Sequence, residues 1–221
     1  MWFYGIPGAG KTILLSYMVE DVKLHCKTQS DKSSICIYYY CYFGRNQDES
    51  AHLVRWAVSQ LARNTQYIPE GIVEILQKGE QPSLSALMDA LSELSSRLNR
   101  VYLLIDALDE SAPRAGLLRV LQQLGADRFS NIKVIATSRE ESDIKRALDD
   151  ISLSVSLSNQ YVDEDIATYV RSSVASNPRL RDYPVDLKEE IERALVEGAR
   201  GMSVDCSISQ CAPAPLLGQV N

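Results

Sequence analysis

The spacing of three glycines near the amino terminus constrains the fold more than any other feature of this sequence. Residues 5–12 read Gly-Ile-Pro-Gly-Ala-Gly-Lys-Thr and match the pattern GxxxxGK(S/T) at every fixed position. An apolar segment, Met1–Tyr4, precedes the pattern, and an amphipathic helix is predicted from Lys11 to about His25. A strand, a glycine-rich turn and a helix in this order predict an α/β fold with a phosphate-binding loop, or P-loop.

Each residue type in the loop has a physical reason. Gly5, Gly8 and Gly10 allow backbone conformations closed to residues with a Cβ, so that consecutive N–H groups can point at a phosphate. We expect Lys11 to reach the β- and γ-phosphates and the Thr12 hydroxyl to bind magnesium. The residues predicted to bind the nucleotide are Gly5, Ile6, Pro7, Gly8, Ala9, Gly10, Lys11 and Thr12. The alternative, a turn that only joins a strand to a helix, is less favoured because both flanking elements are correct.

A carboxylate ends a second apolar strand. Val101–Ile105 is continuously apolar and is followed by Asp106. Ligands of open α/β sheets bind at the carboxyl ends of strands, so we predict that Asp106 binds magnesium together with Thr12. Asp109 and Glu110 follow within one short turn, and either could orient or deprotonate an attacking water. For each of them a solvated loop position is the alternative.

A third apolar strand is predicted at Ile132–Thr137 and is followed by Ser138 and Arg139. If this strand lies beside the strand that precedes the loop, Arg139 is predicted to contact the γ-phosphate or to stabilise transition-state charge. The alternative is a surface arginine paired with Glu140 or Glu141.

Strand and helix patterns alternate along the chain. On the first helix, Ile13 and Val19 are expected on the buried side, and Ile35–Phe43 is predicted to be a strand covered on both faces. Leucines three or four residues apart between Leu84 and Leu98 predict a helix packed against the sheet. A dimer zipper is less favoured because this run is short.

The predicted fold class is α/β, a three-layer P-loop NTPase with a mostly parallel central sheet, followed by a small helical segment. The predicted domains are an NTPase core at residues 1–158, a partial helical subdomain at 159–202 and an irregular, disordered tail at 203–221.

The amino-acid composition of the chain limits the kinds of partner that it can bind and the compartment in which it folds. The 23 basic and 29 acidic residues give a net charge of −6, and no Lys/Arg cluster appears, so nucleic acid is disfavoured as a partner. The longest apolar run, Ile35–Phe43, is too short to span a bilayer. Five cysteines without a CxxC pair argue against a disulfide framework. We therefore expect a soluble, cytoplasmic protein that does not associate with membranes.

Three segments together resemble the NACHT domain of STAND-class P-loop NTPases, in particular the nephrocystin-like N-terminal domains of fungal NLR-like proteins. They are Trp2–Thr12, Val101–Ser111 and Lys133–Glu140. The resemblance implies a signalling switch that binds ATP or GTP with magnesium, hydrolyses it slowly, and assembles with copies of itself or with other protein domains. Nothing in the sequence decides between ATP and GTP.

Two departures from this family favour a competing hypothesis. Only Met1–Tyr4 precedes the loop, and helical periodicity is lost over Ser203–Asn221. We expect a chain truncated at both ends relative to the family. Such a chain could be a non-catalytic fragment that acts as a protein-interaction module, whereas the intact motifs favour the NTPase.

Overall fold

Five parallel strands form one sheet in the computed structural model, which describes residues 1–28, 33–157, 160–181 and 183–199. The strands are β1 (Trp2–Tyr4), β2 (Ser34–Tyr40), β3 (Arg100–Asp106), β4 (Ile132–Ser138) and β5 (Ser154–Ser156). Their order across the sheet is β2-β3-β4-β1-β5, and every neighbouring pair is parallel. The predicted α/β fold with a parallel central sheet is confirmed.

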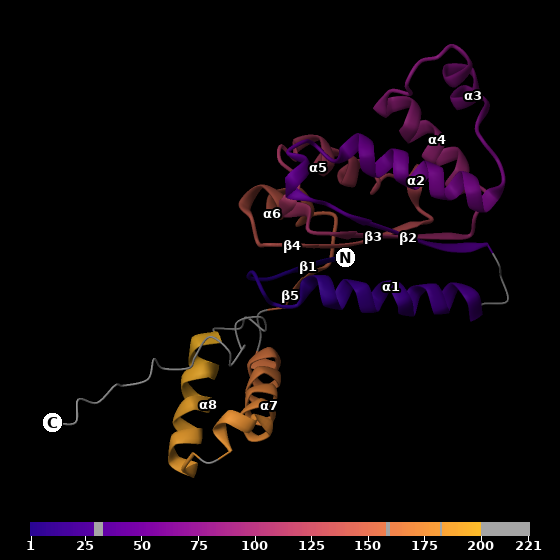
Figure 1. The fold of residues 1–221 in the computed structure, drawn as a ribbon. Coiled ribbons are helices and arrows are strands. Elements are labelled where there is room, and N and C mark those ends of the chain that lie inside the picture. The colour runs from indigo at the N-terminus through magenta and orange to yellow at the C-terminus, as the bar shows by residue number, and fades with distance from the viewer. Residues whose placement is uncertain (29–32, 158–159, 182, 200–221) are drawn as a thin grey trace. The chain divides into compact units, whose positions relative to one another are not determined.

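Helices lie on both faces of this sheet (Figure 1). One face carries α1 (Lys11–Thr28), and the other side carries α2 (Ser50–Thr65), α3 (Glu70–Gln77), α4 (Leu84–Ser96), α5 (Ala115–Gln123) and α6 (Ser142–Leu148). Successive side chains of a strand point to opposite faces. Leu104 of β3 therefore packs with Leu15 and Val19 of α1, whereas Leu103 and Ile105 join the larger core on the other face. The three-layer arrangement follows from these two cores.

The leucine pattern on α4 reflects packing inside the molecule. α4 starts at an N-cap, where the Ser83 hydroxyl accepts a hydrogen bond from the Ala86 N–H at 3.2 Å. Leu91 and Leu94 are buried. The predicted packing partner of this helix was the sheet, whereas α4 packs chiefly against α2.

Two expectations about exposure were wrong. Ile13 is 72% exposed, although Val19 is buried as expected. At about 100° per residue, Ile13 lies well round the helix from Val19, whereas Leu15, four residues before Val19, shares its face. Strand β2 is not covered on both faces, because it lies at the edge of the sheet and leaves Tyr38 and Tyr40 exposed.

A tryptophan covers part of this outer edge. The Cys41 N–H donates to the carbonyl of Asp106 on β3. Because N–H and C=O groups alternate in direction along a strand, the carbonyl of Tyr38 points away from β3. The indole N–H of Trp56, on α2, donates to that carbonyl at 2.9 Å. One main-chain acceptor on the free edge is therefore satisfied from within the molecule.

The chain divides into two compact units. The first comprises Met1–Gly5 and Lys11–Ser156, and the second groups Ile6–Gly10 with the described residues from Leu157 onward. In the second unit, α7 (Gln160–Ser176), a single 3₁₀ turn (Pro178–Leu180) and α8 (Val185–Ala199) share one core. Its buried residues are Ile166, Val170, Val174, Leu180 and Leu195. The predicted helical segment after the sheet is thus present, and the predicted tail at 203–221 lies outside the described residues.

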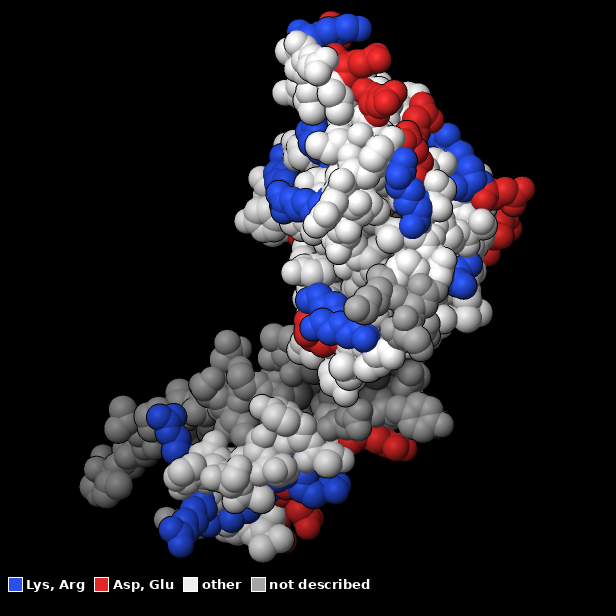
Figure 2. All heavy atoms as spheres, turned by 90° about the vertical axis from the view of Figure 1, so that its right-hand side faces the viewer, with Lys and Arg blue, Asp and Glu red and all other residues white. Residues whose placement is uncertain are grey.

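Charge of both signs is mixed on the surface. On the face drawn in Figure 2, Lys and Arg side chains lie among Asp and Glu side chains. Within the described parts of the chain, no helix has both the length and the apolar character that crossing a bilayer requires.

The core assignment predicts the cost of truncating α4. Leu94→Ala removes a fully buried side chain and is expected to lower the free energy of unfolding by about 2–5 kcal/mol. Leu24→Ala, on an exposed position of α1, is the matched control and is expected to cost about 0.5 kcal/mol or less. Urea denaturation followed by circular dichroism measures both, and equal effects would contradict the assignment of Leu94 to the core.

Candidate nucleotide-binding site

Three strands end side by side at one edge of the sheet. β4 lies between β3 and β1, so Asp106 at the end of β3, Ser138 at the end of β4 and Gly5 just after β1 lie on neighbouring strands. The Gly5 N–H donates to the carbonyl of Ser138 at 3.3 Å. The condition set for Arg139, that its strand lies beside the strand before the glycine-rich loop, is therefore met. The carboxyl ends of parallel strands are where open α/β sheets bind ligands.

Asp106 is held in place by the neighbouring strand. Its side chain is buried, and the Thr137 hydroxyl donates a hydrogen bond to its Oδ1 atom. The same hydroxyl oxygen accepts a hydrogen bond from the Ala107 N–H at 3.1 Å. Thr137 thereby fixes both the carboxylate and the backbone that follows it. A buried carboxylate needs such partners, because burial without them carries a large free-energy cost.

Lys11 lies within electrostatic reach of the acids at this edge. Its Nζ atom donates to the carbonyl of Gly5 at 2.9 Å. Partial burial lowers the pKa of the Lys11 ammonium and so does the charge of Arg139, while Asp109 and Asp106 act in the opposite direction; the net shift is downward. The first unit therefore brings Lys11 together with Asp106, Asp109 and Arg139.

The glycine-rich loop connects β1 to α1. Within it, Gly8 and Gly10 have φ of 77°, in the left-handed region that favours glycine. The Ala9 N–H donates to the carbonyl of Ile6 at 3.3 Å. No neighbouring atom would obstruct a Cβ on Gly10, so its backbone angle is what favours glycine there. This conformation agrees with the reason given for glycine in the pattern.

Asp109 and Arg139 are paired with each other. The Asp109 side chain is 8% exposed, and its Oδ2 atom lies 3.1 Å from Nε of Arg139. Its Oδ1 atom accepts a hydrogen bond from the Arg139 N–H at 3.0 Å. The alternative prediction, that Arg139 pairs with Glu140 or Glu141, is wrong, because Glu140 pairs with Lys145 and Glu141 pairs with Arg114. The Arg139 side chain remains about half exposed.

Arg114 joins the same two chain segments and was not predicted. It donates to the main-chain carbonyl of Asp109 at 2.9 Å and to carboxylate oxygens of Glu141 at 2.6 Å and Asp143 at 2.7 Å. No motif marks Arg114 in the sequence. The only feature of the sequence that could have indicated such a residue is the group of acidic residues after β3 and β4, which need a positive charge nearby.

A second unpredicted cluster joins the segments after β2 and β3. Glu49 is fully buried and accepts hydrogen bonds from Tyr39 Oη and Arg45 Nη1. Its N–H donates to Ser111 Oγ at 3.1 Å. Glu110 accepts a hydrogen bond from the N–H of Phe43 at 3.3 Å. The segment that carries Asp109 and Glu110 is therefore fixed from both sides.

The Cys41 thiol, beside the end of β3, is not poised as a nucleophile. Cys41 is buried next to the end of β3, and burial, followed by the charges of Glu49 and Asp106, raises its pKa to about 12. A thiol with such a pKa stays protonated at neutral pH. Cys41 is therefore a residue of the apolar core.

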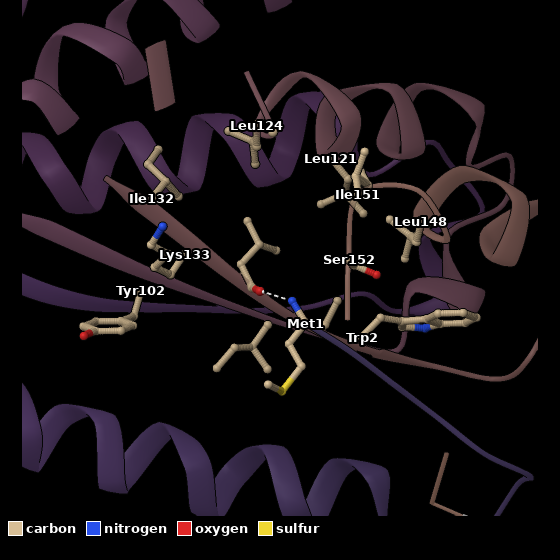
Figure 3. A pocket seen from close by; sticks show the side chains of 14 residues that line it. Met1, Trp2, Tyr102, Leu121, Leu124, Ile132, Lys133, Leu148, Ile151 and Ser152 are labelled. Carbon is tan, nitrogen blue, oxygen red and sulfur yellow. Dashed lines mark hydrogen bonds between the residues drawn. The ribbon is translucent and has the colours of Figure 1, made fainter. Parts of the chain in front are cut away.

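An apolar cavity of about 390 Å³ lies at the opposite, amino ends of β1 and β4 (Figure 3). The Met1 ammonium donates there to the carbonyl of Val134 at 2.8 Å. Its lining contains Lys133 but no carboxylate. A cavity of this composition does not suit a magnesium-bound triphosphate, so the strand-end site is the better candidate.

Comparison with known protein families shows which family this chain is related to. Residues 1–139 match the family described as Nephrocystin 3, N-terminal. The chain belongs to this family. The match includes the glycine-rich loop, Asp106 and Arg139, and it confirms the resemblance to nephrocystin-like N-terminal domains. A search of curated proteins found no match.

Solved structures similar to this nephrocystin 3 N-terminal family member share its fold. The Walker-type ATPase of Pyrococcus abyssi is 16% identical with a TM-score of 0.51, over 92% of this chain and 60% of that chain. The Aeropyrum pernix ORC1 protein in complex with DNA is 14% identical with a TM-score of 0.51, over 90% of this chain and 53% of that chain. Drosophila ORC bound to DNA is 14% identical with a TM-score of 0.53, over 91% of this chain and 52% of that chain. The chain thus spans about half the length of the two ORC chains.

At these identities the likeness shows the fold alone. The ORC structures are complexes with DNA, so the comparisons do not support the exclusion of nucleic acid, which stays a prediction. The roles of individual residues of this nephrocystin 3 N-terminal family member also stay predictions.

The pairing of Asp109 with Arg139 predicts an energetic coupling. In a double-mutant cycle of Asp109→Ala and Arg139→Ala, we expect a coupling of about 1–2 kcal/mol in the free energy of unfolding, because one partner is largely buried. The control cycle of Glu140→Ala and Lys145→Ala joins two half-exposed side chains and is expected to give a smaller coupling. Chemical denaturation measures all variants, and a larger coupling for the control pair would contradict this view of the site.

Proposed function

We propose that this chain binds ATP or GTP together with magnesium and hydrolyses it slowly, as the regulatory switch module of an NLR-like signalling protein. The nucleotide would bind at the carboxyl ends of β1, β3 and β4. The glycine-rich loop, Ile6–Gly10, would provide main-chain N–H groups for the phosphates, and the amino terminus of α1 would add its dipole. Residues 1–158 would form the NTPase core and 159–202 a helical subdomain.

The observation that carries the proposal is the position of Lys11 relative to the acids. Lys11 and the buried Asp106 come from segments about 95 residues apart in the sequence, and they interact electrostatically in the first unit. A lysine at the start of the helix after the loop and a carboxylate at a strand end, both at the carboxyl edge of one sheet, are what a triphosphate with its metal ion requires. Both belong to motifs that were recognised independently.

The residues present suit magnesium. This hard cation prefers oxygen ligands and uses one or two protein groups together with substrate phosphates. The Asp106 carboxylate and the Thr12 hydroxyl would supply those protein oxygens. No group of three or more His, Cys, Asp or Glu able to hold a metal occurs among the described residues, and such a site does not need one. The ion would neutralise charge on the phosphate oxygens.

For hydrolysis we assign the two acids different roles. Asp109 is engaged by the main chain and the side chain of Arg139, which suits a positioning residue. Glu110 would orient and deprotonate the attacking water. Arg139, with its half-exposed side chain, would contact the γ-phosphate and stabilise charge in the transition state.

The proposed switch is an exchange of the partner of Arg139. A γ-phosphate that contacts Arg139 would compete with Asp109 for the guanidinium, because both are anions. Loss of the γ-phosphate on hydrolysis would return Arg139 to Asp109. Such a two-state pairing could couple the nucleotide to assembly with copies of this chain or with other protein domains.

Substitution of Lys11 tests nucleotide binding. Lys11→Ala is expected to weaken binding of fluorescent ATP and GTP analogues with magnesium by about tenfold or more, because a charge-assisted contact to phosphate is lost. Lys27→Ala, an exposed lysine near the other end of α1, is the matched control and should bind as the unmodified chain does. Equilibrium titration by fluorescence anisotropy also gives the base preference.

Asp106→Asn tests the metal in the same assay. We expect this variant to lose the strengthening of nucleotide binding that magnesium produces in the unmodified chain. Circular dichroism establishes that each variant is folded. If folded unmodified protein binds neither nucleotide, the proposed function is wrong.

Substitution of Glu110 tests the role of this acid in hydrolysis. Glu110→Gln is expected to lower the turnover rate by about a hundredfold, the effect typical of a lost general base, while nucleotide affinity changes little. The exposed carboxylate Glu140, changed to Gln, serves as the control and should leave turnover unchanged. Phosphate release from saturating nucleotide measures the rate, and full activity of Glu110→Gln would remove Glu110 from the mechanism.

A further inference from the structure

A second concave surface lies away from the strand ends, between α2 and α3. It is an open groove of about 730 Å³, and α4, which packs against both helices, contributes Leu87 to it. Val58 and Ile72 are buried in the groove. We call this surface the α2–α3 groove.

The groove exposes large apolar side chains. Ile68 is 54% exposed and Leu76, on α3, is 56% exposed. Leu76 follows Ile72 by four residues, so the same face of α3 contributes both its buried and its exposed residue to the groove. An exposed apolar surface gathered in one concave site is typical of a binding surface.

Two arginines give the groove a charge opposite to that of the whole molecule. The chain has a net charge of −6, yet the lining of the groove contains Arg55 and Arg63 and no acidic residue. Both arginines are exposed, and neither forms an ion pair or a side-chain hydrogen bond with any residue that the structure describes. An acidic partner would complement both the charge and the apolar surface.

The surroundings favour a helix as the partner. Most residues that line the groove lie on α2, α3 and α4, where main-chain groups are already hydrogen-bonded within each helix, and the rest belong to the short segments that connect these helices. An extended peptide would find few main-chain partners there, whereas a helix satisfies its own N–H and C=O groups. Amphipathic helices bind to apolar grooves through residues spaced by three or four positions.

We infer that the α2–α3 groove binds an amphipathic helix that carries acidic residues beside its apolar face. Arg55 and Arg63 are eight residues apart on α2, a separation of about 12 Å along the helix axis. The partner's two carboxylates therefore lie seven or eight residues apart, on one side of a stripe of leucine-like residues. The inference does not depend on nucleotide binding.

The test uses a synthetic helical peptide with this pattern: leucines at three- and four-residue steps, two glutamates eight residues apart beside them, and alanine elsewhere. Binding to the full chain is measured by fluorescence anisotropy of the labelled peptide. A second peptide replaces both glutamates with lysine. We expect the unmodified chain to bind the glutamate peptide at least about tenfold more tightly than the lysine peptide, since two ion pairs are replaced by two repulsions.

Charge reversal in the protein gives the decisive comparison. The double variant Arg55→Glu/Arg63→Glu is expected to reverse the preference and bind the lysine peptide more tightly. Leu76→Ser should weaken binding of both peptides by about fivefold or more through lost apolar contact. Arg119→Glu, on an exposed position of α5 outside the groove, should leave both affinities unchanged.

Three outcomes overturn the inference when circular dichroism shows folded protein. They are no binding of the glutamate peptide, equal binding of both peptides by the unmodified chain, and an unchanged preference in the double variant. Sedimentation without peptide adds a further check. Self-association lost on charge reversal would make a second copy of this chain the occupant and would also overturn the assignment.

Discussion

The buried carboxylate of Asp106 imposes a condition that the rest of the site depends on. A buried carboxylate without partners would destabilise the fold by several kcal/mol, so a donor must be supplied from a neighbouring strand. Thr137 supplies it because β4 lies directly beside β3. The same strand order places β1 on the other side of β4, and with it the connection to the glycine-rich loop. A different order would leave the acid without its donor and separate it from Lys11.

Two arginines then connect the segments that follow β3 and β4. Arg139 contacts the side chain of Asp109, and Arg114 contacts its main-chain carbonyl while pairing with Glu141 and Asp143. Separating these segments would leave the largely buried Asp109 carboxylate without its main partner. Asp109 is therefore positioned by charged partners, whereas Asp106 is held by the Thr137 hydroxyl and the strands beneath are positioned by apolar packing.

The sequence was sufficient to predict the α/β fold, because the fold depends on local patterns. The same patterns pointed to the candidate site at the carboxyl ends of the strands. Apolar runs ending in polar residues identified β3 and β4, and the glycine spacing identified the loop between β1 and α1. The pairing of Asp109 with Arg139 was not predicted, since it depends on which strands are neighbours, and strand order is a non-local property. For the same reason Arg114 and Glu49 were missed. The error at Ile13 has a local cause: apolar character near the start of α1 was taken for burial, although residue spacing places Ile13 on another face than Leu15 and Val19.

The hydrogen bond between Trp56 and the carbonyl of Tyr38 has a consequence for the behaviour of the protein in concentrated solution. An edge strand rich in tyrosine and isoleucine is a ready template for strands from other molecules. The indole occupies an acceptor in the second half of β2, and its ring projects from α2 beside the strand. A foreign strand would have to displace it before continuous pairing along that edge. The helix that covers the core thus also protects the sheet against intermolecular growth and aggregation.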